Sequence, residues 1–163
     1  MAIPIYLWLK DEAGNAIKGS VKVQGREESV EVNFFYHHVS LAVDGSDGHI
    51  KGTRQYSPVL FEKELDAASP YLYQALATGK KLTSATFLFY RIDCSGQEEV
   101  YFIISLDDVH VVTIDTGMDD INTPYGRRRN PSEFIEISFE KITWHYVDGN
   151  IKHSESWDNR KTV

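Results

Sequence analysis

Apolar and polar residues alternate along most of this chain, with the period of two that is typical of β-strands. In residues 3–9, aliphatic side chains occupy every odd position, and the even positions hold proline and aromatic residues. This is the pattern of a strand buried on both faces. Similar alternation predicts further strands in residues 19–24, 30–37, 54–64, 82–92, 100–114, 135–146 and 151–157.

One stretch has a helical period instead. Leu72 and Leu76 lie four residues apart, Pro70 suits a first helical turn, and Gly79 can adopt the left-handed conformation that ends a helix. Ser69 is the expected N-cap. We therefore predict an α-helix at about residues 69–79. Because so short a helix is marginal in water, it should bury its leucines against a sheet.

About eight strands and one helix predict a mainly β fold, namely a β-barrel of two packed antiparallel sheets with one flanking α-helix. The apolar phase of the last long strand changes near Glu140, and Asp107 and Asp108 interrupt the strand before it. Bulges or bends are expected at both places. The length of 163 residues fits a single domain that spans residues 1–163.

Two long irregular stretches interrupt the strand pattern, at residues 39–53 and 115–131. The first is polar and rich in glycine around residues 44–48, and loops of this length are usually functional or disordered. The second carries the basic run 127–129. That run could bind nucleic acid, lie in solvent, or meet an acidic patch on a neighbouring subunit.

Composition narrows the classes of partner. There are 24 Asp and Glu residues against 17 Lys and Arg, so the formal net charge of −7 disfavours nucleic acid and anionic membranes as partners. We expect neither a Sec signal peptide nor membrane insertion, because no apolar run approaches the roughly 20 residues that span a bilayer. Cys94 is the single cysteine, which predicts folding in a reducing cytosol without an internal disulfide.

A search for catalytic and metal-binding patterns yields no site. His37 and His38 are adjacent on a predicted strand and should point to opposite faces, so they cannot chelate one ion together. Asp108 and His110 share a face, but such a pair is more often a surface contact than a catalytic dyad. We therefore predict no enzyme, no catalytic residues, no metal and no cofactor. These residue patterns alone predict a soluble β protein and do not indicate a particular function.

Several short segments, in their order and spacing along the whole chain, carry a family resemblance. They are Ile3-Pro4-Ile5-Tyr6-Leu7, Lys18-Gly19-Ser20, the residues Phe61, Lys63, Asp66, Ser69, Pro70, Tyr71 and Leu72, then Phe139-Glu140-Lys141-Ile142-Thr143-Trp144, Asp148-Gly149-Asn150 and Ser156-Trp157. With these segments the chain resembles the haemolysin-coregulated protein (Hcp) family, which forms the tube of bacterial type VI secretion systems.

The resemblance implies a subunit that forms homohexameric rings, which stack into a tube expelled from the cell. It implies type VI spike and sheath proteins as partners, and effector proteins held and protected in the ring lumen. The protein would be made in the bacterial cytoplasm and secreted without a Sec signal. The chain ends about six residues past Trp157, so no added effector domain is expected. The alternative is a secreted monomeric β-domain that binds a host or cell-surface ligand.

Within this picture we assign the first irregular loop to contacts between stacked rings, with the basic run as its partner surface. Attraction between acidic and basic loops at opposite rims would weaken with salt. The competing interpretation is a disordered loop tip without a partner. The residues assigned to ring stacking are Asp44, Gly45, Ser46, Asp47, Gly48, His49, Arg127, Arg128 and Arg129.

Overall fold

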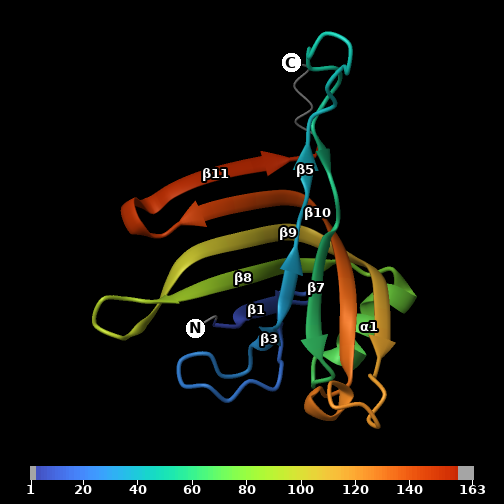
Figure 1. Ribbon diagram of the computed structural model, residues 1–163, viewed down its shortest axis with the longest axis vertical. Coiled ribbons are helices and arrows are strands. Elements are labelled where there is room, and N and C mark those ends of the chain that lie inside the picture. The colour runs from blue at the N-terminus through green and yellow to red at the C-terminus, as the bar shows by residue number, and fades with distance from the viewer. Residues whose placement is uncertain (1–2, 158–163) are drawn as a thin grey trace.

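The computed structural model describes residues 3–157, which are mainly β with one α-helix (Figure 1). The strands are β1 (Ile5–Lys10), β2 (Ala16–Ile17), β3 (Val30–Val32), β4 (Phe34–Tyr36), β5 (Val39–Ser40), β6 (Gln55–Tyr56), β7 (Val59–Glu64), β8 (Leu82–Ile92), β9 (Glu98–Gly117), β10 (Ser132–Tyr146) and β11 (Ile151–Ser156). The helix is α1 (Ser69–Thr78), and two short 3-10 helices are η1 (Gly126–Arg128) and η2 (Asp148–Asn150).

Nine of these strands form one antiparallel sheet in the order β2-β1-β8-β9-β10-β7-β4, with β11 on β10 and β3 on β1. Residues 30–36 link the two sides of this sheet. Their first half, β3, pairs with β1, and their second half, β4, pairs with β7. Between the two halves, the Asn33 amide donates to the Glu62 carbonyl at 2.9 Å.

The predicted mainly β class with one helix is confirmed. The described strands do not form the predicted barrel, because their hydrogen bonds do not run continuously around the sheet. The segment 30–36 pairs with β1 in its first half and with β7 in its second half. The two sides of the sheet are therefore joined by the continuous backbone of this segment, and β3 and β4 do not pair with each other. The second sheet is a ribbon of β5 and β6 alone.

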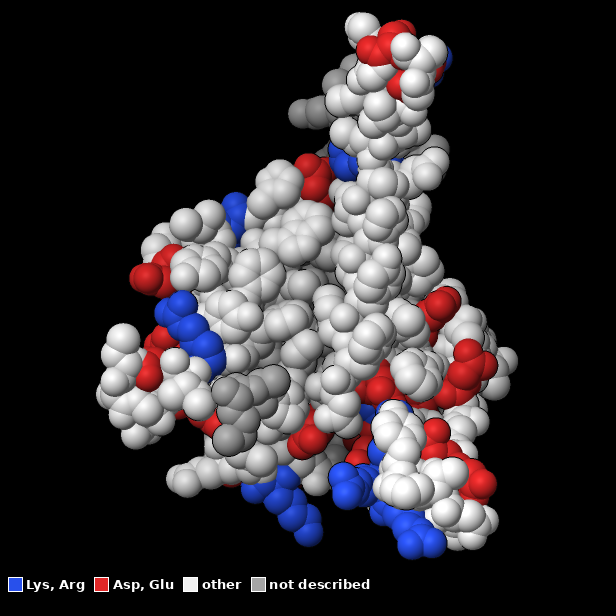
Figure 2. Space-filling model, in the orientation of Figure 1, with Lys and Arg blue, Asp and Glu red and all other residues white. Residues whose placement is uncertain are grey.

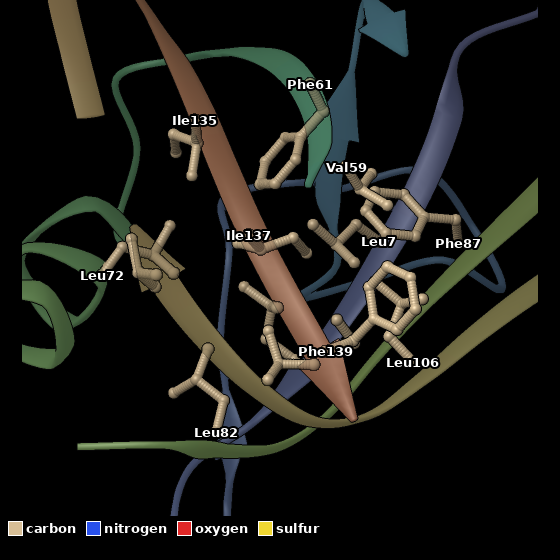
Figure 3. Packing of buried hydrophobic residues seen from close by; sticks show 14 of the residues in the cluster. Leu7, Val59, Phe61, Leu72, Leu82, Phe87, Leu106, Ile135, Ile137 and Phe139 are labelled. Carbon is tan, nitrogen blue, oxygen red and sulfur yellow. The ribbon is translucent and has the colours of Figure 1, made fainter. Parts of the chain in front are cut away.

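The hydrophobic core lies inside this curved sheet and under the helix (Figure 3). On β10, the odd-numbered residues Ile135, Ile137 and Phe139 face the core. After Glu140 the buried position is the even-numbered Ile142. The predicted change of phase near Glu140 is therefore confirmed. On the neighbouring strand, Asp108 has a positive φ of 51°, which marks the bend expected there.

Helix α1 ends as predicted, with Gly79 in the left-handed conformation (φ 66°). Leu72 is fully buried and Leu76 packs partly buried against the core. The predicted N-cap is wrong, because Ser69 is the first helical residue and its side chain points into the protein. The Asp66 side chain accepts the Ala68 amide at 3.0 Å in its place.

Ser69 belongs to a buried charged cluster that joins the helix to the sheet. Lys63 of β7 and Glu133 of β10 are completely buried, and Lys63 Nζ lies 2.8 Å from Glu133 Oε2 and 2.7 Å from Asp66 Oδ1. The Ser69 hydroxyl accepts from Lys63 at 2.8 Å and donates to Glu133 at 2.9 Å. Buried charges persist only when paired in this way, so the cluster fixes α1 on β7 and β10.

Residues 39–56 form a long hairpin, here called the arm, which projects from one end of the molecule (Figure 1). β5 and β6 pair at its base, Val43 and Ile50 form a bridge further out, and the Gly48 amide donates to the Asp44 carbonyl at the turn. The arm is therefore a paired ribbon rather than the irregular stretch that the sequence predicts. No helix among residues 3–157 is long and apolar enough to cross a membrane.

Candidate functional site

The tip of the arm is an ordered turn whose acidic groups bond within the turn. The Asp44 carboxylate forms an ion pair with Lys51 and accepts hydrogen bonds from the Ser46 amide (2.8 Å) and hydroxyl (2.6 Å). The Lys51 contact, and then those of Ser46, lower the pKa of Asp44 to about 2. Asp47 accepts the His49 amide at 2.9 Å. Much of the acidic charge predicted to attract a partner is thus already engaged.

The sides of the arm expose apolar residues instead. More than a third of each side chain is open to solvent at Val39 (43%), Leu41 (39%), Val43 (60%) and Ile50 (48%). Single exposed apolar residues are ordinary, but a run of them along a projecting hairpin is typical of a surface that another chain covers.

At the opposite end of the molecule lies the segment 118–131, here called the basic loop (Figure 1). Arg129 is half-buried and pairs with Glu62, lies 3.6 Å from Asp119, and donates to the Tyr125 hydroxyl at 2.6 Å. The Tyr125 hydrogen bond and the Glu62 charge raise the pKa of Arg129. Arg129 therefore holds its own loop in place, and it differs from its neighbours in the basic run.

Arg127 and Arg128 remain on the surface of the basic loop. The Arg127 Nε donates to the Ile121 carbonyl at 3.1 Å, and both guanidinium groups belong to exposed residues. Three large apolar side chains are exposed beside them, at Met118 (64%), Ile121 (57%) and Tyr125 (63%). This end of the molecule thus combines positive charge with apolar surface.

The residues assigned to stacking therefore fall at two opposite ends, and the fold does not bring them together within one chain. Figure 2 shows acidic side chains at the tip of the arm and basic side chains, with acidic ones beside them, at the other end, while the centre of this face is uncharged. A contact between the two ends requires two copies of the chain.

An aromatic cluster joins the arm to the body, and the sequence analysis missed it. The His37 ring stacks on Tyr56 (6.4 Å between centroids, 7° between planes) and meets Phe139 edge-on at 5.6 Å. Trp157 lies 5.5 Å from Tyr56 and 6.2 Å from Phe139. The sequence signal for this cluster is the alternation along the strand, since His37 lies two residues after Phe35 and therefore on the same inward-facing side. Its partners come from distant segments.

The other candidate groups occupy ordinary positions. His38 is exposed, whereas the neighbouring His37 packs inward. Asp108 pairs with Lys81 at 2.7 Å, an interaction that raises the pKa of Lys81. Within residues 3–157, no group of three or more His, Cys, Asp or Glu side chains is placed to hold a metal ion.

Comparisons with known proteins agree along nearly the whole chain. The family model described as "Type VI secretion system effector, Hcp" matches residues 6–146. The chain is 30% identical over 148 residues to the major exported protein of Pseudomonas aeruginosa, covering 91% of this chain and 83% of that relative.

Solved structures give the same result. The chain resembles Hcp1 of Escherichia coli EAEC 042 with 48% identity and a TM-score of 0.86, over 96% of this chain and 99% of that one. It also resembles the secreted protein Hcp3 of Pseudomonas aeruginosa, with 25% identity and a TM-score of 0.76, over 94% and 97% of the two chains.

Proposed function

This chain belongs to the Hcp family of type VI secretion system proteins, and from that membership we propose that it is a structural subunit of the secretion tube. Six copies form a ring, and rings stack into the tube that is expelled. The observation that carries this proposal is the placement of two unlike exposed surfaces, the arm and the basic loop, at opposite ends of one chain that matches the family from residue 6 to residue 146.

The stacking contact runs between the arm of one copy and the basic loop of a copy in the next ring. In this proposal, residues 44–49 at the tip approach Arg127 and Arg128 of the next copy, and the exposed apolar sides of the arm meet the exposed Met118 and its apolar neighbours. Burial of one valine or isoleucine side chain contributes roughly 1.5–3 kcal/mol, more than a typical exposed ion pair. Arg129 contributes to this contact indirectly, because its ion pair with Glu62 orders the basic loop.

Symmetry explains why two unlike surfaces are needed. A contact between different patches on each copy repeats without end unless a rotation closes it. Side-to-side contacts between bodies close the ring, and contacts from arm to basic loop then repeat along the tube axis. A monomeric ligand-binding module has no use for such a pair of surfaces.

Within this function, type VI spike and sheath proteins and effector proteins carried in the lumen are the expected partners, without nucleic acid or membrane insertion. The protein is made in the cytoplasm and leaves through the secretion machine, without a Sec signal and without an enzymatic role. Family membership and the exported relative support this route.

Shortening residues 44–48 to a tight turn tests the stacking contact. The variant should keep the mass of a hexamer in solution, while tube formation and secretion fall. A matched control replaces the turn at residues 94–96, which lies between β8 and β9 and away from the arm (Figure 1). Loss of the hexamer in the arm variant, or unimpaired secretion, would show that the arm has another role. A monomeric wild-type protein would favour the ligand-binding alternative.

A further inference from the structure

The arm is attached to the body through the aromatic cluster, and His37 is its central ring. His37 lies between β4 of the body and β5 of the arm, and Tyr56 ends the returning strand β6. Phe139 belongs to β10 and Trp157 directly follows β11. The His37 ring therefore contacts Tyr56 of the arm on one side and Phe139 of the body on the other. This aromatic packing and the ion pair between Arg54 of the arm and Glu155 of β11 hold the arm to the body.

The surroundings of His37 favour a neutral imidazole over a charged one. The His37 Nε2 atom is buried and has no hydrogen-bond partner among the described residues. Burial is the main cause that lowers the pKa of His37 from its usual 6.5, and the neighbouring His38 acts in the same direction. A hydrogen bond with the Ser57 backbone opposes them. Protonation would place an N–H and a positive charge where nothing described accepts them.

The charged groups around the cluster do not offset that charge. Arg54 donates from Nε to the Tyr56 hydroxyl at 2.8 Å, and its guanidinium lies 5.9 Å from the Tyr56 ring. Glu155 of β11 is already bound by Arg54 at 2.5 Å and by His153 at 2.9 Å. No acidic side chain within residues 3–157 is paired with His37. An added proton on the His37 ring therefore gains no paired counterion among residues 3–157.

We propose that His37 is a pH-sensitive latch, which holds the arm against the body when neutral and releases it when protonated. This inference rests on the proposed stacking role of the arm and adds its regulation. Because the folded state favours the neutral ring, the packing is complete above pH 6.5 and weakens as the pH falls below that value. Rings then remain intact in mild acid while their stacking weakens.

Amide hydrogen exchange tests the latch directly on the assembled wild-type protein. After correction for the intrinsic exchange rate, protection of residues 39–56 should fall at least tenfold between pH 7.5 and pH 5.5. His37→Phe keeps an aromatic ring in the cluster and removes the titration, so its arm should stay protected at both values. His38→Phe is the matched control and should behave like the wild type.

Equal loss of protection in His37→Phe, or no loss in the wild type, would overturn the proposal. A second measurement needs no variant: the His37 ring resonances should titrate with a midpoint below 6.5, and a midpoint at or above that value also contradicts the latch. Tube formation at pH 7.5 is scored separately. If tubes never form, the stacking function fails, while the exchange and titration data still decide whether His37 controls the arm.

Discussion

Individual charged residues inside this protein have roles that their sequence neighbours do not reveal. Lys63 and Glu133 are 70 positions apart and meet completely buried, with Ser69 between them. Local chemistry alone assigned Ser69 to the helix cap, because serine before proline is a strong capping signal. In the fold the Ser69 hydroxyl instead accepts from the buried lysine and donates to the buried glutamate, which come from strands distant in the sequence.

Removing one charge of this pair should be costly. Glu133→Ala removes the fully buried counterion of the Lys63 ammonium and leaves Asp66 as its carboxylate partner, so we expect a loss of about 3–5 kcal/mol in the free energy of unfolding. Glu140→Ala, at an exposed position of the same strand, should change it by less than about 0.5 kcal/mol. Urea unfolding followed by circular dichroism measures both. Equal midpoints for the two variants would mean that the cluster does not fix the helix.

A second buried cation depends on its shape as well as its charge. Arg26 is only 7% exposed and lies 3.7 Å from the Tyr90 ring centre and 4.7 Å from that of Tyr6, with Glu98 at 2.5 Å. A lysine keeps the charge but cannot stack its planar group on both rings. Arg26→Lys should therefore lower the unfolding free energy by about 1–2 kcal/mol.

The exposed pair formed by Lys18 and Glu28 provides the control for Arg26. Both side chains are more than half exposed, so Lys18→Ala should cost no more than about 0.5–1 kcal/mol. Thermal unfolding of the two variants under one set of conditions separates them. An Arg26→Lys variant as stable as Lys18→Ala would show that stacking contributes little.

At the scale of elements, the sequence predicts most where signals are local. The helix and its end at Gly79 follow from period and capping chemistry, and both are confirmed. The sequence predicts an irregular stretch at the arm because the paired strands are only two residues long and flank a turn rich in aspartate and glycine. At the base of the arm, Tyr56 packs against Phe139 of β10 and against Trp157. These residues are distant in the sequence, so the local pattern does not reveal the pairing.

The helix offers a direct test of which face packs inward. Leu72 is fully buried, so Leu72→Ala should cost about 2–5 kcal/mol, including the cavity that it leaves. Leu76 is only partly buried and should cost less when truncated to alanine. Gln74→Ala, at an exposed position, should be nearly neutral. Similar denaturation midpoints for Leu72→Ala and Gln74→Ala would contradict the observed packing.

For the whole molecule, the pattern of alternation predicts the mainly β class, and the placement of the two loops at opposite ends needed the structure. The basic run looked uniform in sequence, but Arg129 turns inward to Glu62 because β7 passes beside the loop. Likewise, Asp44 bonds to Lys51 across the arm. Because these charges are already paired within one chain, we expect apolar burial to contribute more to the stacking contact than attraction between charges does.

The balance between charge and apolar burial can be measured in tubes. At about 0.5 M salt the screening length falls to roughly 4 Å, which suppresses attraction between exposed charges and leaves apolar contacts unaffected. We expect tubes to persist at this salt concentration in the wild type, and Val43→Ser to reduce tube yield, by sedimentation, more than Arg128→Gln does. Hexamer mass should be unchanged in both variants.

Val23→Ser serves as the control for this comparison, because Val23 is similarly exposed (42%) but lies outside the arm and the basic loop. It should leave tube yield unchanged. Dissolution of wild-type tubes at 0.5 M salt, together with a larger defect in Arg128→Gln than in Val43→Ser, would return the contact to an electrostatic one. That result would mean that the Arg127 and Arg128 charges, rather than the apolar sides of the arm, set the strength of stacking.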